Sequence, residues 1–283
     1  MEKTDESKTT GSKSSSEGAS KTSSSVVHVP ENCPTLAEAI KRVEQNPQLT
    51  TVQLGKGDFT DFGTGTMSIE LTCPIEIRGA GMGATVLHNV AFSLRKPKEE
   101  GALIDDAIIV IADITFDGTT VKDMNGHGGG INTKSGSIPL RVERCAFLNT
   151  NVGVCASGVP ASVVSCVVRG CKQDGIKAYK TTVTLSGTGT EISNCFNGPA
   201  DQPREDQYAL GSRTETSCIK IVAPLGTDIA SGNYAGRNLG GYGRIEIVDE
   251  QGNMIQLVSE SSPAPVPKPI ISDINERTQW DKH

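Results

Sequence analysis

A repeat of about 22 residues in the middle of the chain constrains the fold more than any other feature. Four segments place one apolar residue in the same small-residue setting, and positions 131, 154, 176 and 210 lie 23, 22 and 34 residues apart. The segments are GGGINT, NVGVCAS, QDGIKAY and QYALGSR, with Ile131, Val154, Ile176 and Leu210. The last spacing returns to about 22 if the polar, proline-containing stretch NGPADQPREDQ is an inserted loop of about 12 residues. This column predicts coils that stack in register.

A second column places a cysteine three positions after an aliphatic residue. It consists of Val142 with Cys145, Val163 with Cys166 and Ile192 with Cys195. The earlier segment ADITFDG aligns with ERCAFLN, which puts Phe116 in register with Phe147. Short strands with this period and no helix between them form a solenoid, whose coils bury their inward side chains only by stacking on each other. We therefore expect an all-β chain with both columns in its core.

Both ends of this solenoid carry capping elements. Thr35 and Glu38 form a capping-box pattern, and apolar residues then recur at helical spacing, so the sequence predicts a short helix over residues 36–45. At the other end, RIEIVDEQGNMIQLV predicts a hairpin of strands 244–248 and 254–258. Such a hairpin can cover the C-terminal edge of the solenoid.

Composition divides the chain into one domain between two tails. Residues 1–25 are rich in Ser, Thr and Lys and contain almost no hydrophobic residues, which predicts a disordered tail. The segment SSPAPVPKP ends the fold near residue 260, so residues 261–283 form a proline-rich C-terminal tail. Residues 26–260 then form the solenoid domain.

Charge and hydropathy exclude several classes of partner. The formal net charge is −6 at pH 7, which disfavours nucleic acid and anionic membranes as the main partner. There is no apolar run of 18 residues and no signal-peptide pattern, so we expect no membrane insertion and a soluble protein that is cytoplasmic rather than secreted. The 8 cysteines would then be mostly reduced thiols, and their spacing predicts no zinc site. We expect no cofactor, with calcium as the alternative.

The pattern as a whole resembles a known superfamily. The segments PTLAEAI and TVQLGKGDF, the following PIEIRGAGMGATVL and the coils from 107 to 222 are similar to the pectin-lyase-like superfamily, over most of residues 27–258. The resemblance implies a single-stranded right-handed parallel β-helix whose open end is capped by the short N-terminal helix. The stretches VHVPENCPTLAEAI and KIVAPL also look like uncharacterised β-helix proteins of unicellular algae, which implies no activity.

Polygalacturonases share this fold, and the chain is similar to them in one respect. Asp105 and Asp106 precede Gly126-His127-Gly128, as an Asp pair precedes a Gly-His-Gly in that family. That chemistry needs two carboxylates on either side of a glycosidic bond. The family's Asn-Thr-Asp would fall at HNVAFS, which contains no acid, and its Arg-Ile-Lys is matched only by Ile176-Lys177. The catalytic candidates are therefore Asp105, Asp106, His127 and Lys177, in an incomplete set.

Two further groups of residues are candidates for binding. Asp113, Asp117 and Asp123 lie close together in sequence and are the candidates for a calcium site, with solvated acids as the alternative. In SGNYAGRNLGGYGR, tyrosines and arginines alternate with Gly and Asn, a composition that can stack on sugar rings or anchor a protein, with a locally packed loop as the alternative. These binding candidates are Tyr234, Arg237, Tyr242 and Arg244.

The functional hypothesis that follows is a non-catalytic scaffold or recognition module. Its long face would bind a polysaccharide or a protein partner. The first alternative is a carbohydrate-active enzyme, a polysaccharide hydrolase or lyase. The second alternative is a self-associating structural protein, because solenoid ends and edges can pair with each other.

Overall fold

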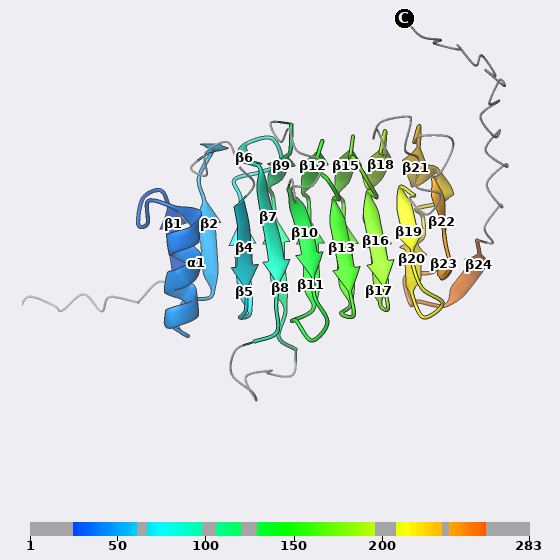
Figure 1. Cartoon of the computed structure of the whole chain (residues 1–283), viewed down its shortest axis with the longest axis horizontal. Helices are drawn as coiled ribbons and strands as arrows, with labels where there is room; N and C mark the ends of the chain where they lie inside the picture. Colours follow the sequence, from blue (N-terminus) through cyan, green and yellow to red (C-terminus); the bar gives the residue numbers. More distant parts are fainter. Residues whose placement is uncertain are drawn as a thin grey trace, which may run out of the picture.

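The chain is a parallel β-helix with one short helix at its N-terminal end (Figure 1). The computed structural model describes residues 25–60, 67–97, 106–119, 129–195, 208–233 and 238–258. The two predicted tails, apart from Ser25, and the predicted insert NGPADQPREDQ lie outside these ranges. Three sheets run along the axis, and each of the seven complete coils from β2 to β22 contributes one strand to each sheet.

The largest sheet, called sheet A here, has ten strands and contains the first and the last strand of the described chain. All its strand pairs are parallel except the final one, between β23 and β24. Its members in spatial order are β1 (Val26–Val29), β2 (Thr51–Leu54), β5 (Ile75–Arg78), β8 (Ile109–Ala112), β11 (Leu140–Glu143), β14 (Ala161–Val164), β17 (Thr182–Ser186), β20 (Cys218–Val222), β23 (Arg244–Val248) and β24 (Met254–Leu257).

The other two sheets have seven parallel strands each. Sheet B consists of β3 (Gly57–Phe59), β6 (Thr85–His88), β9 (Thr115–Asp117), β12 (Ala146–Leu148), β15 (Val167–Arg169), β18 (Glu191–Ser193) and β21 (Ala230–Ser231), the last preceded by the 3₁₀ turn Thr227–Ile229. Sheet C consists of β4 (Met67–Leu71), β7 (Val90–Leu94), β10 (Gly130–Thr133), β13 (Val154–Ser157), β16 (Ile176–Tyr179), β19 (Leu210–Ser212) and β22 (Leu239–Gly241).

The first predicted column is confirmed in sheet C. Ile131 is the register partner of Val154, Val154 of Ile176, and Ile176 of Leu210. All four side chains are fully buried. Leu210 therefore keeps its place in the register despite the long spacing before it. This is the result expected if the extra residues form an inserted loop.

The second predicted column, of aliphatic residues that precede cysteines, is confirmed for Val142 and Val163 but not for Ile192. Val142 pairs with Val163 in sheet A, but the next partner of Val163 is Leu185. Ile192 lies in sheet B instead, where it pairs with Val168. The alignment of Ile192 with the sheet A column was wrong.

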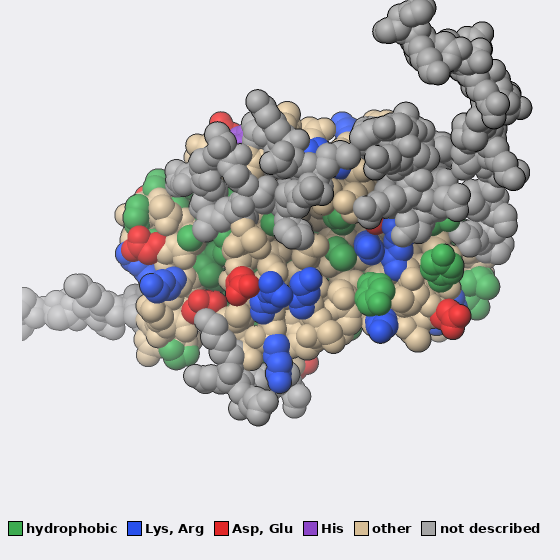
Figure 2. All heavy atoms as spheres, in the orientation of Figure 1, with side chains coloured by type: hydrophobic (Ala, Val, Ile, Leu, Met, Phe, Trp, Pro, Cys, Tyr) green, Lys and Arg blue, Asp and Glu red, His purple; other side chains and the backbone are tan. Residues whose placement is uncertain are grey.

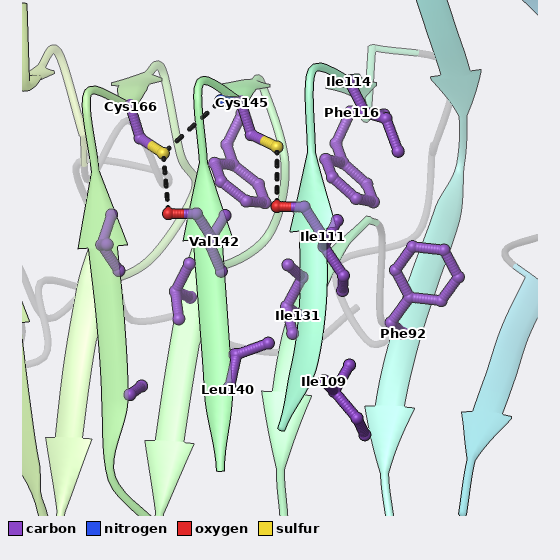
Figure 3. Close-up of a cluster of buried hydrophobic side chains, with 14 of the residues drawn as sticks. Phe92, Ile109, Ile111, Ile114, Phe116, Ile131, Leu140, Val142, Cys145 and Cys166 are labelled. Atoms are coloured by element: carbon purple, nitrogen blue, oxygen red, sulfur yellow. Dashed lines mark hydrogen bonds between the residues drawn. The ribbon is translucent and has the colours of Figure 1, made fainter. Parts of the chain in front are cut away.

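Aromatic rings stack along the interior of the early coils (Figure 3). The rings of Phe116 and Phe147, register partners in sheet B, are parallel within 5° with centroids 4.9 Å apart. Phe92 from sheet C meets Phe116 edge to face at 5.6 Å. Because a coil can bury side chains only against its neighbours, such stacks link successive coils into one core.

Cysteines occupy the interior of two corners of the coil, each directly after a residue with positive φ. At the corner from sheet A to sheet B, Cys145 follows Arg144 (φ 46°), and its amide N–H lies 3.5 Å from Sγ of Cys166, one coil on (Figure 3). At the corner from sheet B to sheet C, Cys195 follows Asn194 (φ 51°). The left-handed residue turns the backbone sharply, and the small cysteine side chain fits inside the bend.

The predicted helix and hairpin are both confirmed. Helix α1 (Leu36–Gln45) begins after Thr35, whose Oγ1 accepts a hydrogen bond from the Glu38 amide at 3.2 Å. Its apolar side packs against β1 and β2 and covers the N-terminal end of the solenoid (Figure 1). At the C-terminal end, β23 and β24 form the antiparallel hairpin, with Gly252 at φ 86° in its turn.

Candidate functional site

The structure does not bring together those predicted catalytic residues that it describes. Asp105 and His127 lie outside the described residues. Asp106 is exposed in the connection that leads to β8, whereas Lys177 lies on β16. The coil of β7, to which this connection belongs, is three strand spacings from β16, or about 14 Å along the axis. Asp106 and Lys177 therefore cannot act on one glycosidic bond.

The last glycine of the run after His127 has a structural role. Gly130 has φ 96°, and a Cβ atom at this position would lie 2.0 Å from the carbonyl oxygen of Val152. No side chain fits so close to the backbone of the next coil. The end of the glycine run is therefore explained by the packing of β10.

The calcium candidates are held apart by the fold. Asp113 lies at the corner between sheets A and B, whereas Asp117 ends β9, four residues further along an extended segment. Their Cα atoms are thus about 13 Å apart. Asp123 lies outside the described residues, and among the described ones no cluster of three His, Cys, Asp or Glu side chains can hold a metal ion. The described members do not form a common site.

Asp113 is instead the centre of an ion-pair network on successive coils. It accepts hydrogen bonds from Arg144 at 2.7 and 2.8 Å and from Arg78 at 2.9 Å. Arg78 also pairs with Glu76, and Arg144 with Glu143 at 3.1 Å. The hydrogen bonds from Arg144 hold the pKa of Asp113 below its ordinary value. This network pairs the charge of Asp113 with two arginines at the corner.

The sequence did not single out His88, which lies between two carboxylates on the outer face of sheet B. Its Nε2 atom is 3.1 Å from Oδ1 of Asp58 on β3, and its Nδ1 atom is 3.4 Å from Oδ2 of Asp117 on β9. Asp117 also accepts the Thr119 amide N–H at 2.9 Å. Because the imidazole ring fills the space between the two carboxylates, a sugar ring cannot sit there as a two-carboxylate hydrolysis would require. The cluster links three coils and forms no substrate cleft.

The outer face of sheet C carries basic and aromatic side chains. Strand alternation directs the residues one and three positions after each buried column residue to solvent. We name this set of outward residues the sheet C strip. Its basic and aromatic members outside the buried pair of Arg213 with Asp174 are Arg95, Lys134, Lys177, Tyr179 and Tyr242, and we include Lys180, which directly follows Tyr179. Figure 2 shows basic side chains over the ends of β7 and β10, and basic and hydrophobic ones together near β16 and β19.

The register places members of the strip side by side. Lys134 follows Thr133, the partner of Leu94, so Lys134 lies beside Arg95. Tyr179 is 40% exposed, with Nζ of Lys180 5.5 Å from its ring centroid, and Tyr242 is 75% exposed. Along the axis, a polymer would therefore meet a cation, a polar side chain or an aromatic ring about every 4.8 Å.

A buried ion pair forms part of the same face. Arg213 pairs with Asp174, and their side chains are only 6% and 1% exposed. The Tyr208 amide donates to Oδ1 of the same Asp174 at 3.0 Å. The Tyr208 ring packs closely against Gly240, where a Cβ atom would be 2.2 Å from Cε1 of the ring. These contacts pack the surface beside the strip tightly.

Charge along the strip is predominantly positive. Its acidic neighbour on sheet C is Glu70, whose Oε1 lies 3.2 Å from Nε of Arg95. Cys155 lies between Asn132 and Lys177 in the outer row, and burial raises the pKa of its thiol. The strip is thus a cationic surface on a chain that is acidic as a whole.

The predicted binding residues are only partly on this face. Tyr234 and Arg237 lie outside the described residues. Tyr242 belongs to the strip, whereas Arg244 begins β23 in sheet A, and its Nη1 lies 3.2 Å from Oε1 of Glu246. The fold therefore separates Tyr242 from Arg244, although only one residue lies between them in the sequence.

The sequence contains a pattern that identifies three strip residues that were not predicted. Arg95, Lys134 and Tyr179 each lie three residues after a buried residue of the sheet C column: Phe92, Ile131 and Ile176. The period of 2 along a strand assigns them to the outer face once the column is known. His88 offered no such signal, because Asp58 and Asp117 lie 30 and 29 residues from it in the sequence.

Comparisons with known proteins give no relative for this chain. No family model, no curated protein and no solved structure matches it significantly. In the described part of the chain, no helix is long and apolar enough to cross a lipid bilayer.

Proposed function

We propose that the protein is a non-catalytic recognition module that binds an anionic polysaccharide along the sheet C strip. The observation that carries this proposal is the set of cations and exposed tyrosines along the outer face of one sheet. Cations attract the carboxylate or sulfate groups of such a polymer, and exposed Tyr rings offer flat apolar surfaces to sugar rings. The resemblance to pectin-lyase-like proteins enters this proposal only as a resemblance in fold.

The regular spacing of the strip supports a polymer rather than a small molecule. Arg95, Lys134 and Tyr179 lie on β7, β10 and β16 or directly after them, with Ser157 between them on β13. Each contact repeats at the spacing of one coil, so a long chain gains many weak contacts at once. A small ligand would need a concave pocket, which a flat sheet face does not offer.

The non-catalytic part of the proposal rests on the charge of the strip. Glycoside hydrolysis needs two carboxyl groups on either side of the bond that breaks. The carboxylate described on this face at an exposed position is Glu70, and it is paired with Arg95. The other ion-paired carboxylate, Asp174, is buried against Arg213.

Binding is tested with a carboxylated polymer (alginate), a sulfated one (dextran sulfate) and neutral dextran of matched length, using calorimetry. We expect both anionic polymers to bind and dextran to bind much more weakly, with affinity that falls as salt rises. The double variant Lys134→Ala and Lys177→Ala should weaken binding roughly threefold to tenfold, as expected for one exposed and one partly exposed charge contact.

The matched control is Lys220→Ala, which removes a partly exposed lysine from the outer face of sheet A. It should leave the affinity unchanged. An equal loss in Lys220→Ala would show that only net charge matters and would contradict a specific strip. Failure of both anionic polymers to bind would also contradict the proposal and point to a protein partner.

The enzyme alternative is tested on the same polymers by release of reducing ends and of unsaturated products, with and without Ca²⁺. The proposal expects no turnover. Turnover that is lost in His127→Ala would replace the proposal with a polysaccharide hydrolase or lyase.

A further inference from the structure

The last strand of sheet A presents an open and apolar edge. β24 has one neighbour, β23, and its other edge faces no strand in the described part of the chain. Met254, Ile255 and Leu257 are 61%, 61% and 52% exposed. Strand edges that do not pair are usually protected by charged residues or proline, and β24, with the sequence MIQL, has neither.

The opposite edge of the same sheet is closed. The backbone of β1 at His28 accepts hydrogen bonds from the amides of Asn32 at 2.8 Å and Cys33 at 3.1 Å. The His28 amide donates to Oδ1 of Asn32 at 3.2 Å. Together with α1, which packs on β1 and β2, this turn satisfies the first strand. The described chain therefore has one open edge in sheet A.

We propose that β24 pairs antiparallel with β24 of a second copy of this chain and closes a symmetric dimer. This inference goes beyond the proposed function and is independent of it. Two identical edges that pair antiparallel are related by a twofold axis, so each copy satisfies the other. Because the β1 edge is closed, the assembly stops at two chains and does not grow into a fibre.

The residues of the strand fit this partner. A twofold axis requires a register that is centred on one residue. With the axis at Gln256, Ile255 lies opposite Leu257 of the other copy, and Met254 lies opposite Val258. The stretch from Asn253 to Val258 contains no charged residue, so identical strands meet without like-charge repulsion. Pairing would extend the ten-stranded sheet across both chains and cover apolar side chains that are now in water.

The test is the mass of the full-length chain in solution by light scattering and sedimentation, over a range of concentrations. We expect a dimer, and slower amide exchange in residues 254–257 as the concentration rises. Ile255→Lys places two like charges near the twofold axis and should raise the dimer dissociation constant more than about tenfold. Ile255 is exposed, so this variant should still fold.

Two controls make the result specific. Ile108→Lys introduces the same charge at another exposed isoleucine, 38% exposed, and should leave the dimer intact. Mixing Ile255→Lys with Ile255→Glu should restore association through the opposite charges. A wild-type chain that stays monomeric at all concentrations would overturn the proposal, as would a dimer that Ile255→Lys does not weaken.

The competing occupant of the edge is the chain's own C-terminal segment, residues 259–283. A chain that ends at Val258 separates the two cases. If the full chain is monomeric and the shortened chain dimerises, the segment covers β24 and the proposed dimer is wrong. If both dimerise and both respond to Ile255→Lys, the second copy is the partner.

Discussion

Asp113 and Arg144 form a two-pronged contact between successive coils: Nε of Arg144 lies 2.7 Å from Oδ1 of Asp113, and Nη2 lies 2.8 Å from Oδ2. Both residues have positive φ, 61° and 46°, at the same corner of the solenoid. The ion pair therefore joins two tight turns of neighbouring coils on their outer side. Arg78 from a third coil adds a further hydrogen bond.

Asp113→Asn should lower the free energy of unfolding by about 1 kcal/mol near neutral pH, the scale of a charge-assisted contact close to the surface. Asparagine tolerates positive φ, so the backbone keeps its conformation. Arg144 lowers the pKa of Asp113, so this stability is present above the ordinary Asp pKa and disappears as pH falls through the lowered value. Urea unfolding against pH measures the difference, which should vanish in acid.

The matched control for this variant is Asp106→Asn, because Asp106 is exposed and also has positive φ, 76°. It should change stability by much less than Asp113→Asn. If the two variants lose the same amount, the contact with Arg144 is not the source of the stability.

Phe116→Ala should cost about 3 to 5 kcal/mol, because it removes the ring that Phe147 stacks on and Phe92 meets edge to face. Phe59→Ala, at a half-buried position on β3, should cost clearly less. A double-mutant cycle between Phe116 and Phe147 should give a coupling of about 0.5 to 1.5 kcal/mol from chemical denaturation. No coupling would mean that the stacked geometry adds nothing beyond burial.

Gly130→Ala should destabilise the fold by more than about 3 kcal/mol, because its Cβ would meet the Val152 carbonyl oxygen at 2.0 Å in addition to the positive φ. Gly136→Ala separates the two causes. Gly136 has φ 79°, but its nearest neighbour would be Cγ of Lys96 at 3.8 Å, an ordinary contact. We expect only about 1 kcal/mol there, and similar thermal unfolding of the two variants would refute the clash.

The sequence predicted the architecture well because a solenoid repeats its core residues at a fixed interval. The column through Ile131, Val154 and Ile176 needs only the period and the small residues around it. Ile192 was assigned to the wrong sheet because the same local pattern occurs at two corners. Both corners place a left-handed residue before a cysteine, as Ser165 precedes Cys166 and Asn194 precedes Cys195.

The outer face of sheet C was harder to predict, because it depends on contacts between coils. Lys177 was singled out as the partner of acids that the fold places elsewhere, whereas its actual neighbours on the outer face are Cys155 and Gly211. Tyr242 and Arg244 were grouped because they are close in sequence, although a corner lies between them. Adjacency in a solenoid comes from the register of neighbouring coils, and sequence proximity indicates it poorly.

The thiols of the core should make stability fall in alkali. Cys166 is fully buried, and burial raises its pKa to about 11. Its unfolded thiol ionises near pH 8.5, so the unfolded state loses the proton first and stability declines between these two values. Replacing Cys166 with Ala should remove up to about 1.4 kcal/mol per pH unit of this slope.

Denaturant unfolding between about pH 8 and 10.5 measures this slope. The control is Cys155→Ala, which removes a partly exposed thiol and should have a smaller effect. An unchanged slope in Cys166→Ala would show that other groups, such as tyrosines or lysines, cause the alkaline loss.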